Sequence, residues 1–309
     1  MNDSNQAAGS SRPRDTLRFP GGRLRHDHWT ALASVAGGHR GGVQLTVRGG
    51  ARIVDSDGEP VPVDTRDLAS AGLPERFAHP GAGDILASPM AGRLGGHHDI
   101  ADLPDQLDAA LRGRAEADVT NQRVLFGIDD GSGDVLAHNP DLAVVVDGTD
   151  GTARVHVGGR DVPYRVPVAD AAIVMADAAA AITGSAGASP IHDGESLHRL
   201  VVDAVGAHPV SIAAPERGTG ATTTAVEVPS VGWIDTADGL VSLLAVVPHG
   251  IVPARLAEFI GAVERPTTVS ADRVIGLHEL TETMAEQVVR VLAPMGMIFD
   301  AGSPWVTGR

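Results

Sequence analysis

The amino-acid sequence predicts an α+β fold in which one strand-and-helix unit occurs twice, with a larger α/β region between the copies. The chain has 309 residues, 43% of them hydrophobic, which is enough for several packed cores. Hydrophobic residues alternate between the two-residue period of strands and the 3.6-residue period of helices. The segment Pro20–Leu24 also recurs as Pro248–Val252, and a helical pattern follows it each time.

The first unit opens with the turn signal of Pro20–Leu24. The apolar spacing of Asp27–Gly37 predicts a helix, with Asp27 as its N-cap. Alternating apolar residues predict a strand over Val43–Arg48, followed by a turn at Gly49-Gly50 and an extended segment at Arg52–Val54.

The second unit repeats this order. Gly232–Val247 is strand-like, Pro253–Val263 has the apolar stripe of a helix, and Thr267–Leu277 is again extended. Placing the copies together puts Arg48 on Arg273, if the second copy has a shorter turn.

Between the copies, strand and helix patterns alternate, which predicts an α/β region behind a Pro- and Asp-containing connector at 60–80. One expected strand begins at Ile85, and four more cover 124–128, 142–146, 153–157 and 162–166. The expected helices of this region cover 102–111, 169–182 and 197–205. A further helix is expected at 279–292, after the second copy.

Charge and composition exclude several function classes. The net charge of −15 argues against nucleic-acid binding, which needs clustered basic groups. Every basic residue is Arg, so Schiff-base lysine chemistry and a P-loop are excluded. The chain has no Cys, which excludes disulfides, thiolate nucleophiles and Cys-ligated metals within it. With no signal peptide and no apolar run long enough for a bilayer, a cytoplasmic location is expected, without a membrane partner.

Six motifs, taken in order, carry a resemblance to the sulfite/nitrite reductase superfamily. They are Pro20-Gly-Gly-Arg-Leu, Leu45-Thr-Val-Arg-Gly, Ile85-Leu-Ala-Ser-Pro-Met-Ala-Gly, Phe126-Gly-Ile-Asp-Asp-Gly-Ser-Gly-Asp-Val-Leu, Val231-Gly-Trp and Met297-Ile-Phe-Asp-Ala-Gly-Ser-Pro-Trp. Within this superfamily the chain most resembles the precorrin-3B synthases of aerobic cobalamin biosynthesis, over residues 16–309.

The resemblance implies two ferredoxin-like half-domains related by a pseudo-two-fold axis, an inserted α/β domain and the start of a second one. The implied division is a disordered tail at 1–15, a first half-domain at 16–66, an α/β domain at 67–205, a linker at 206–229, a second half-domain at 230–278, and a truncated second α/β domain at 279–309.

The same resemblance implies O₂-dependent oxidation of precorrin-3A, a tetrapyrrole substrate, with a [4Fe–4S] cluster and iron as cofactors and siroheme not expected. The family's cluster cysteines follow a segment like Ser303-Pro-Trp, whereas this chain has none. Three alternatives stay open: a non-catalytic tetrapyrrole-binding protein, a separate Cys-rich partner chain, and a sulfite or nitrite reductase relative, which the missing lysines and cysteines disfavour.

Arginines are the candidate substrate-binding residues, because a guanidinium binds carboxylates in a bidentate manner and a tetrapyrrole carries many acetate and propionate arms. The candidates are Arg48, Arg52, Arg273 and Arg93, each of which could instead be a solvated strand-end or loop residue. No catalytic residue is assigned.

Other conspicuous clusters receive structural interpretations. His26–His28 and His97–Asp99 resemble metal ligands, but they lack a paired downstream motif and are expected to be surface loops, so no metal site is predicted. Gly218–Thr224 lacks the spacing of a phosphate-binding loop and is expected to be linker. Asp129-Asp130 is interpreted as turn chemistry.

Overall fold

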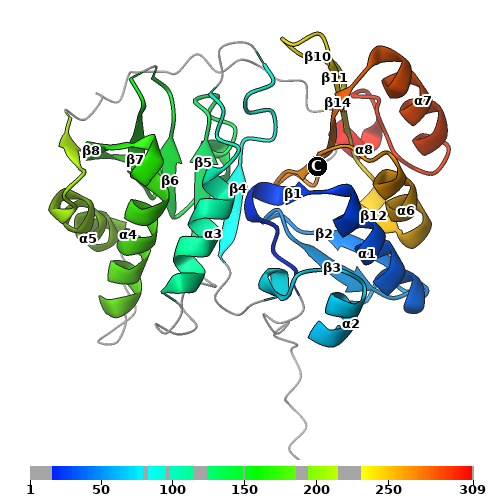
Figure 1. The fold of residues 1–309 in the computed structure, drawn as a ribbon, viewed down its shortest axis with the longest axis horizontal. Coiled ribbons are helices and arrows are strands. Elements are labelled where there is room, and N and C mark those ends of the chain that lie inside the picture. Colours follow the sequence, from blue (N-terminus) through cyan, green and yellow to red (C-terminus); the bar gives the residue numbers. More distant parts are fainter. Residues whose placement is uncertain are drawn as a thin grey trace, which may run out of the picture.

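The computed structural model describes residues 16–78, 83–94, 98–114, 124–148, 150–185, 194–214 and 231–307. Figure 1 shows two parts side by side: a sheet flanked by α3, α4 and α5, and a second part in which α1, α6 and α7 accompany two further sheets. The expected tail at 1–15, His97 and the Gly218–Thr224 segment lie outside the described residues.

The first copy of the repeated unit follows the predicted order, although its helix starts elsewhere than expected. The ring Nδ1 of His28 accepts a hydrogen bond from the Arg25 backbone N–H at 3.2 Å, so Arg25 is the N-cap and the prediction of Asp27 is wrong. The elements are η2 (Pro20–Gly22), β1 (Arg23–Leu24), α1 (His26–Gly38), β2 (Gly42–Leu45), β3 (Ala51–Val54), α2 (Thr65–Ser70) and η3 (Glu75–Ala78).

The second copy adds a hairpin in front of the unit, because the Gly232–Val247 segment folds as two strands. Its elements are β10 (Gly232–Asp235), β11 (Val241–Ala245), η6 (Pro248–Gly250), β12 (Ile251–Pro253), α6 (Ala254–Ala262), β13 (Thr267–Val269), β14 (Ile275–Leu280), α7 (Glu282–Leu292) and α8 (Pro304–Thr307).

The two copies exchange their first strands. Strand β1 of the first copy pairs with β13 of the second, and β12 of the second pairs with β2 of the first. The resulting sheets have the orders β1-β13-β14-β11-β10 and β12-β2-β3. Helices α1 and α6 pack against each other, with Trp29 and Ile260 fully buried in the shared core. This reciprocal pairing creates the pseudo-two-fold relation and confirms the predicted α+β class.

The hairpin turns of the two copies correct one predicted equivalence. In the turns Thr46–Gly49 and Ser270–Arg273, the fourth residue donates its N–H to the carbonyl of the first, at 3.2 and 2.9 Å respectively. Those fourth residues, Gly49 and Arg273, both have a left-handed backbone with φ of 69° and 59°. Arg273 is therefore the counterpart of Gly49, and the match of Arg48 to Arg273 is wrong by one residue.

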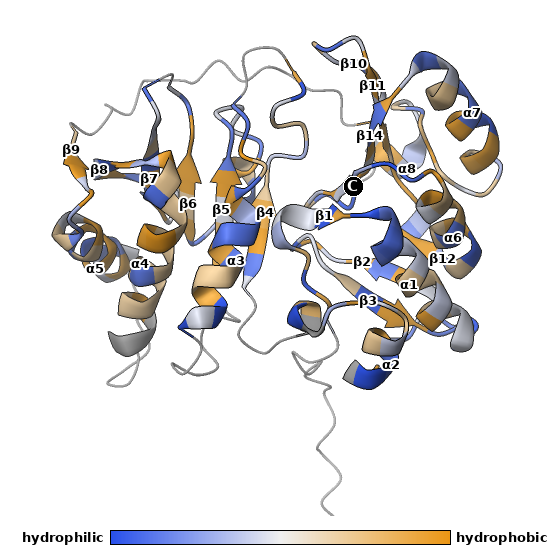
Figure 2. Ribbon diagram, viewed as in Figure 1, coloured by the Kyte–Doolittle hydropathy of each residue, from blue (hydrophilic) through white to orange (hydrophobic). Residues whose placement is uncertain are grey.

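The inserted part is one six-stranded sheet of order β4-β5-β6-β7-β8-β9. The first three strands run parallel and the others antiparallel. Strands β4, β5 and β6 are mostly hydrophobic (Figure 2), as is typical of buried parallel strands. The elements are β4 (Asp84–Ala87), α3 (Leu103–Gly113), β5 (Leu125–Asp129), η4 (Leu136–His138), β6 (Leu142–Val145), β7 (Thr152–Val157), β8 (Arg160–Pro167), η5 (Val168–Asp170), α4 (Ala171–Ser185), α5 (Gly194–Ala207) and β9 (Ile212–Ala213).

Two stretches expected to be irregular contain ordered elements. Helix α2 lies within the connector at 60–80, and strand β9 lies within the segment expected to be linker. Within the described part of the chain, no helix has the length and apolar character needed to cross a membrane.

Candidate functional site

A row of three adjacent cavities follows the seam between the six-stranded sheet and the paired half-domains. We call them the apolar cavity, of about 280 Å³, the middle cavity, of about 390 Å³, and the arginine cavity, of about 410 Å³. Thr268 of β13 lines all three. Strand β13 therefore forms a wall common to all three cavities, and β1, which pairs with it through the strand exchange, lines the middle and arginine cavities.

The apolar cavity lies between β4, the segment around η4, and the β13–β14 hairpin. Its polar lining includes Asp134, His138 and Asp272, with His138 Nε2 3.5 Å from the Asp272 carboxylate across the seam. Its hydrophobic lining is contributed by both parts of the molecule and includes Leu86, Met90, Val135, Leu244, Val274 and Val306.

The middle cavity is lined by Arg23 and Arg93, and by Asp99, Asp238 and Glu279. Arg93 Nη2 lies 3.6 Å from the Glu279 carboxylate. Burial lowers the pKa of Arg93, and the charge of Arg23 lowers it further, although Glu279 opposes the shift. The sequence pointed to Arg93 through its turn motif, and the structure places it in the cleft.

The arginine cavity brings together residues that the sequence analysis did not connect. They come from four separate segments, namely β1 with the start of α1, η3, the turn after β4, and the α6–β13 loop, and no spacing rule links these four. Its basic residues are Arg23, Arg25, Arg76, Arg93 and Arg265.

Behind Thr268 lies a fully buried histidine. Nε2 of His278 is 2.8 Å from the Thr268 hydroxyl, and Nδ1 is 2.9 Å from the Ser242 hydroxyl. Burial holds the pKa of His278 well below its usual value, so the ring is neutral and hydrogen-bonded on both sides. Gly276 leaves room for this contact, since a Cβ there would come within 2.6 Å of both His278 Nε2 and Thr268 Oγ1.

The structure places the predicted Arg48 at the turn between β2 and β3, where its Nη1 donates to Asp84 at 2.9 Å. The other oxygen of Asp84 accepts from the buried Arg18 at 2.9 Å. Next to Arg48, the Cβ position of Gly49 is within 3.6 Å of Leu86 and Val269, which both line the apolar cavity. Arg48 is thus next in the chain to a residue that borders the apolar cavity, although Arg48 itself lines none of the cavities described above.

The other two predicted arginines point elsewhere. Arg52 on β3 donates through Nε to the Thr16 hydroxyl at 2.9 Å. Arg273 lines a separate cavity of about 290 Å³ together with His249 and Trp305. The structure does not bring the four predicted arginines into one site, and their roles in binding stay predictions.

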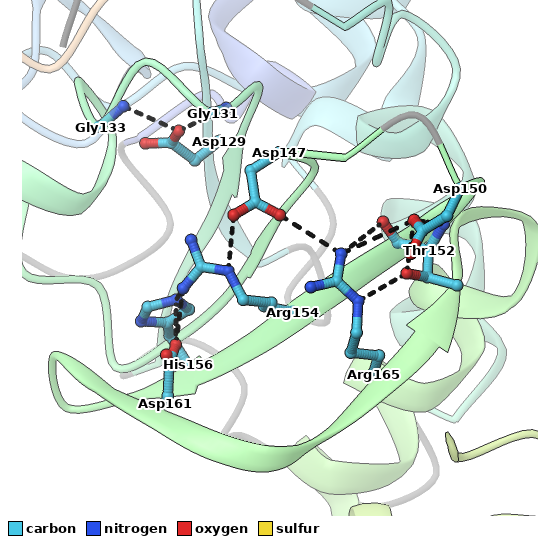
Figure 3. Close-up of polar contacts among 10 residues, drawn as sticks. All are labelled: Asp129, Gly131, Gly133, Asp147, Asp150, Thr152, Arg154, His156, Asp161 and Arg165. Carbon is cyan, nitrogen blue, oxygen red and sulfur yellow. Dashed lines mark hydrogen bonds and ion pairs between the residues drawn. The ribbon is translucent and has the colours of Figure 1, made fainter. Parts of the chain in front are cut away.

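The turn after β5 has one possible set of metal ligands among the described residues, formed by Asp129, Asp130 and Asp134. The Asp129 carboxylate, however, accepts backbone N–H groups of Gly131 and Gly133, as Figure 3 shows, and two more from residues 135 and 136. A carboxylate so occupied is holding the loop, and this confirms the turn-chemistry interpretation.

A second polar network stabilises the far side of the same sheet. Asp147 accepts from Arg154 at 2.8 Å and from Arg165 at 3.3 Å, and lies between them in Figure 3. Arg154 and His156 both contact Asp161, at 2.8 and 2.7 Å. These pairs join β6, β7 and β8, and they line none of the three cavities of the seam.

Comparison with known proteins supports the fold. No protein-family model matches the chain, and no curated protein matches by sequence. Among solved structures, the Mycobacterium tuberculosis NirA protein is similar with a TM-score of 0.65 and 14% sequence identity. The match covers 92% of this chain and 57% of that one, so the chain spans little more than half of that protein. The similarity shows a sulfite/nitrite reductase-like fold with its paired half-domains.

A cluster of the kind associated with this fold family does not fit the residues present. A [4Fe–4S] cluster is held by cysteine thiolates, and the sequence contains no Cys. The chain therefore offers no protein ligand of that type.

Proposed function

We propose that this chain binds a carboxylate-rich tetrapyrrole of the precorrin type in the seam cleft, as part of a precorrin-3B synthase-like oxidoreductase. The supporting observation is the side-by-side placement of an apolar cavity and a cavity that presents Arg23 and Arg93, although Asp99, Asp238 and Glu279 also line the second one. A tetrapyrrole has an apolar ring with carboxylate arms, and these two surfaces match its two parts.

Arg48 fits the same ligand from the other edge. Asp84 occupies only its Nη1, and the half-exposed guanidinium keeps further donors for a carboxylate. Arg52 and Arg273 lie farther from the shared wall of the cleft, and we assign them no direct contact with the ring.

A titration of the purified chain with sirohydrochlorin, followed by the absorbance of the tetrapyrrole, tests the binding. We expect saturable binding that Arg93→Gln weakens about tenfold, as expected for the loss of one charged hydrogen bond. Arg66→Gln is the matched control, since the Arg66 side chain is 91% exposed on α2. Folded protein that leaves the spectrum unchanged contradicts the proposal.

Oxidation of precorrin-3A distinguishes an oxidoreductase from a non-catalytic tetrapyrrole-binding protein. Precorrin-3A supplied with iron and O₂ should bind without being oxidised if the redox centre resides on a separate, Cys-rich chain. Oxidation by this chain alone would instead show that it carries its own redox site, and binding without turnover in the presence of any such partner would favour a binding protein.

A further inference from the structure

The arginine cavity concentrates positive charge in a strongly acidic protein. Five arginines line it, against the carboxylates of Asp105 and Glu264, while the whole chain carries a net charge of −15. Positive charges gathered in a partly buried space repel each other, so a cluster of arginines requires a local reason. A bound anion supplies such a reason.

Two of the five guanidinium groups have close partners, Arg25 with the Asp27 carboxylate and Arg23 with the Ala101 carbonyl. The other three, those of Arg76, Arg93 and Arg265, lack a close carboxylate. The Nε atoms of Arg76, Arg93 and Arg265 are buried and make no hydrogen bond. Arg76 and Arg93 each face a carboxylate at 3.6 Å, beyond hydrogen-bond distance. Arg265 Nη2 reaches only the thioether sulfur of Met284, at 3.5 Å, which is a weak acceptor.

A buried histidine adds a neutral donor to the same lining. His28 is 3% exposed, and its Nδ1 accepts from the Arg25 backbone N–H, so Nε2 carries the hydrogen. That Nε2 makes no hydrogen bond. Burial is the main cause that lowers the pKa of His28 to about 4; Arg25 and Arg76 lower it further, whereas Asp27 and Asp105 oppose the shift. The ring is thus uncharged at neutral pH.

An unpartnered buried donor is costly, and several around one cavity indicate a missing acceptor. The structural alternative is that these arginines fasten the α/β part to the half-domains. Such a role requires close ion pairs across the seam, as Arg18 makes with Asp84 at 2.9 Å. The long, indirect pairs of Arg76 and Arg93 differ clearly from that contact.

The arrangement selects the geometry of the anion. The donors come from four separate segments of the chain and surround the space, whereas a carboxylate accepts hydrogen bonds mainly in one plane. A tetrahedral oxyanion offers acceptor oxygens on all sides. We propose that the arginine cavity is a binding site for a phosphate group, free or as part of a small phosphate ester. This site adjoins the middle cavity proposed for the tetrapyrrole and shares Arg23 and Arg93 with it, so its test uses Arg76 and Arg265, which line the arginine cavity alone.

Thermal unfolding and calorimetric titration of the full chain with inorganic phosphate and pyrophosphate, in a chloride buffer at pH 7.5, test the site. We expect saturable binding and a rise in Tm. Arg76→Gln and Arg265→Gln should each weaken binding about tenfold or more, because each removes a charged donor. Arg66→Gln, exposed and outside every cavity described above, should leave phosphate binding unchanged.

A second readout separates binding from a structural role. Because its buried Nε has no acceptor without ligand, Arg265→Gln should not lower Tm in phosphate-free buffer. Arg76→Gln should lower it only slightly, through the lost cation–π contact with Phe77 at 4.9 Å. Arg265→Lys, which keeps the charge, should retain part of the affinity and serves if a glutamine variant fails to fold. The proposal is overturned if phosphate and pyrophosphate do not bind, if citrate binds where they do not, or if the variants lose Tm without phosphate and bind it as before.

Discussion

The two copies of the repeated unit have the same backbone but are covered by different neighbours. Each enters its first strand through a residue with left-handed backbone, Gly21 with φ of 63° and His249 with φ of 58°. A Cβ on Gly21 would come within 2.9 Å of Ala87 and Pro104, because the inserted α/β part packs on it. The ring of His249 instead packs edge-on against Trp305, with centroids 4.8 Å apart.

The turn therefore requires the left-handed backbone angle in both copies, whereas the segment packed against the turn determines whether a side chain fits there. Left-handed backbone is strained for any side chain, but only glycine also permits close contact with another part of the chain. The first copy is thus adapted to carry the inserted part, and the second copy to carry the C-terminal segment.

The largest expected effect comes from the glycine that follows in each copy. A Cβ on Gly22 would lie 1.9 Å from the Val269 carbonyl oxygen on β13, whereas on Gly250 it would meet the flexible Arg273 side chain at 2.8 Å. We expect Gly22→Ala to lower the free energy of unfolding by more than about 4 kcal/mol, or to prevent folding. Gly250→Ala should lower it by about 1–2 kcal/mol. Urea denaturation measures both, and equal losses would contradict the asymmetry.

The next effect concerns the ion pair that only the first copy makes with β4. Arg18 is 8% exposed and paired with Asp84, while the corresponding position of the second copy is the apolar Val246. Asp84→Asn leaves a buried guanidinium without its counter-charge, so we expect a loss of about 3–5 kcal/mol in urea denaturation. Asp105→Asn, on an exposed acid with a longer ion pair, is the control and should change stability little.

Asp134, which lines the apolar cavity beside the second copy, has a raised pKa. Burial raises the pKa of Asp134 to about 6, and the charges of Asp129 and Asp130 raise it too, while the hydrogen bond from Ser88 opposes the shift. Between pH 4 and 6 the unfolded chain ionises this group before the folded one does, so its contribution to stability falls as the pH rises and is lowest above pH 6.

Asp134→Asn removes that penalty. We expect the variant to be more stable than the parent by about 1–3 kcal/mol at pH 7.5, and the gain to vanish near pH 4. Thermal unfolding of both proteins at each pH measures it. A gain that is the same at pH 4 and 7.5 would show that ionisation is not its cause.

The smallest effect separates the two hairpin turns. Arg273 holds the left-handed position that Gly49 holds in the first copy. Arg273→Gly relieves that strain but increases the entropy of the unfolded chain, so we expect a net gain of about 0–1 kcal/mol. Arg273→Ala keeps the strained angle and removes the side chain, and it should show no gain. If the alanine variant is stabilised as much as the glycine variant, backbone strain is not the reason.

Local patterns predicted most of the elements. The helices α1, α3, α4, α5 and α6 lie within a few residues of their predicted ranges. Four of them carry apolar residues at helical spacing, and α4 is a long apolar run interrupted by Asp177. The Gly232–Val247 segment has a strand-like pattern and folds as a hairpin of two strands, closed by a hydrogen bond from the Thr236 N–H to the Leu240 carbonyl. Apolar alternation shows that a segment is extended, but it does not show where the segment turns back to pair with itself.

The sequence by itself determined the α+β class, the internal repeat, the acidic charge and the absence of thiolate and lysine chemistry, because these depend on residue identity and short spacing alone. Only the tertiary structure decided that the copies exchange β1 and β12, and that β13, the new partner of β1, lines three cavities. It alone gathered five arginines from four separate segments into one cavity. Contacts between residues so far apart depend on the packing of whole units, and no local pattern encodes them.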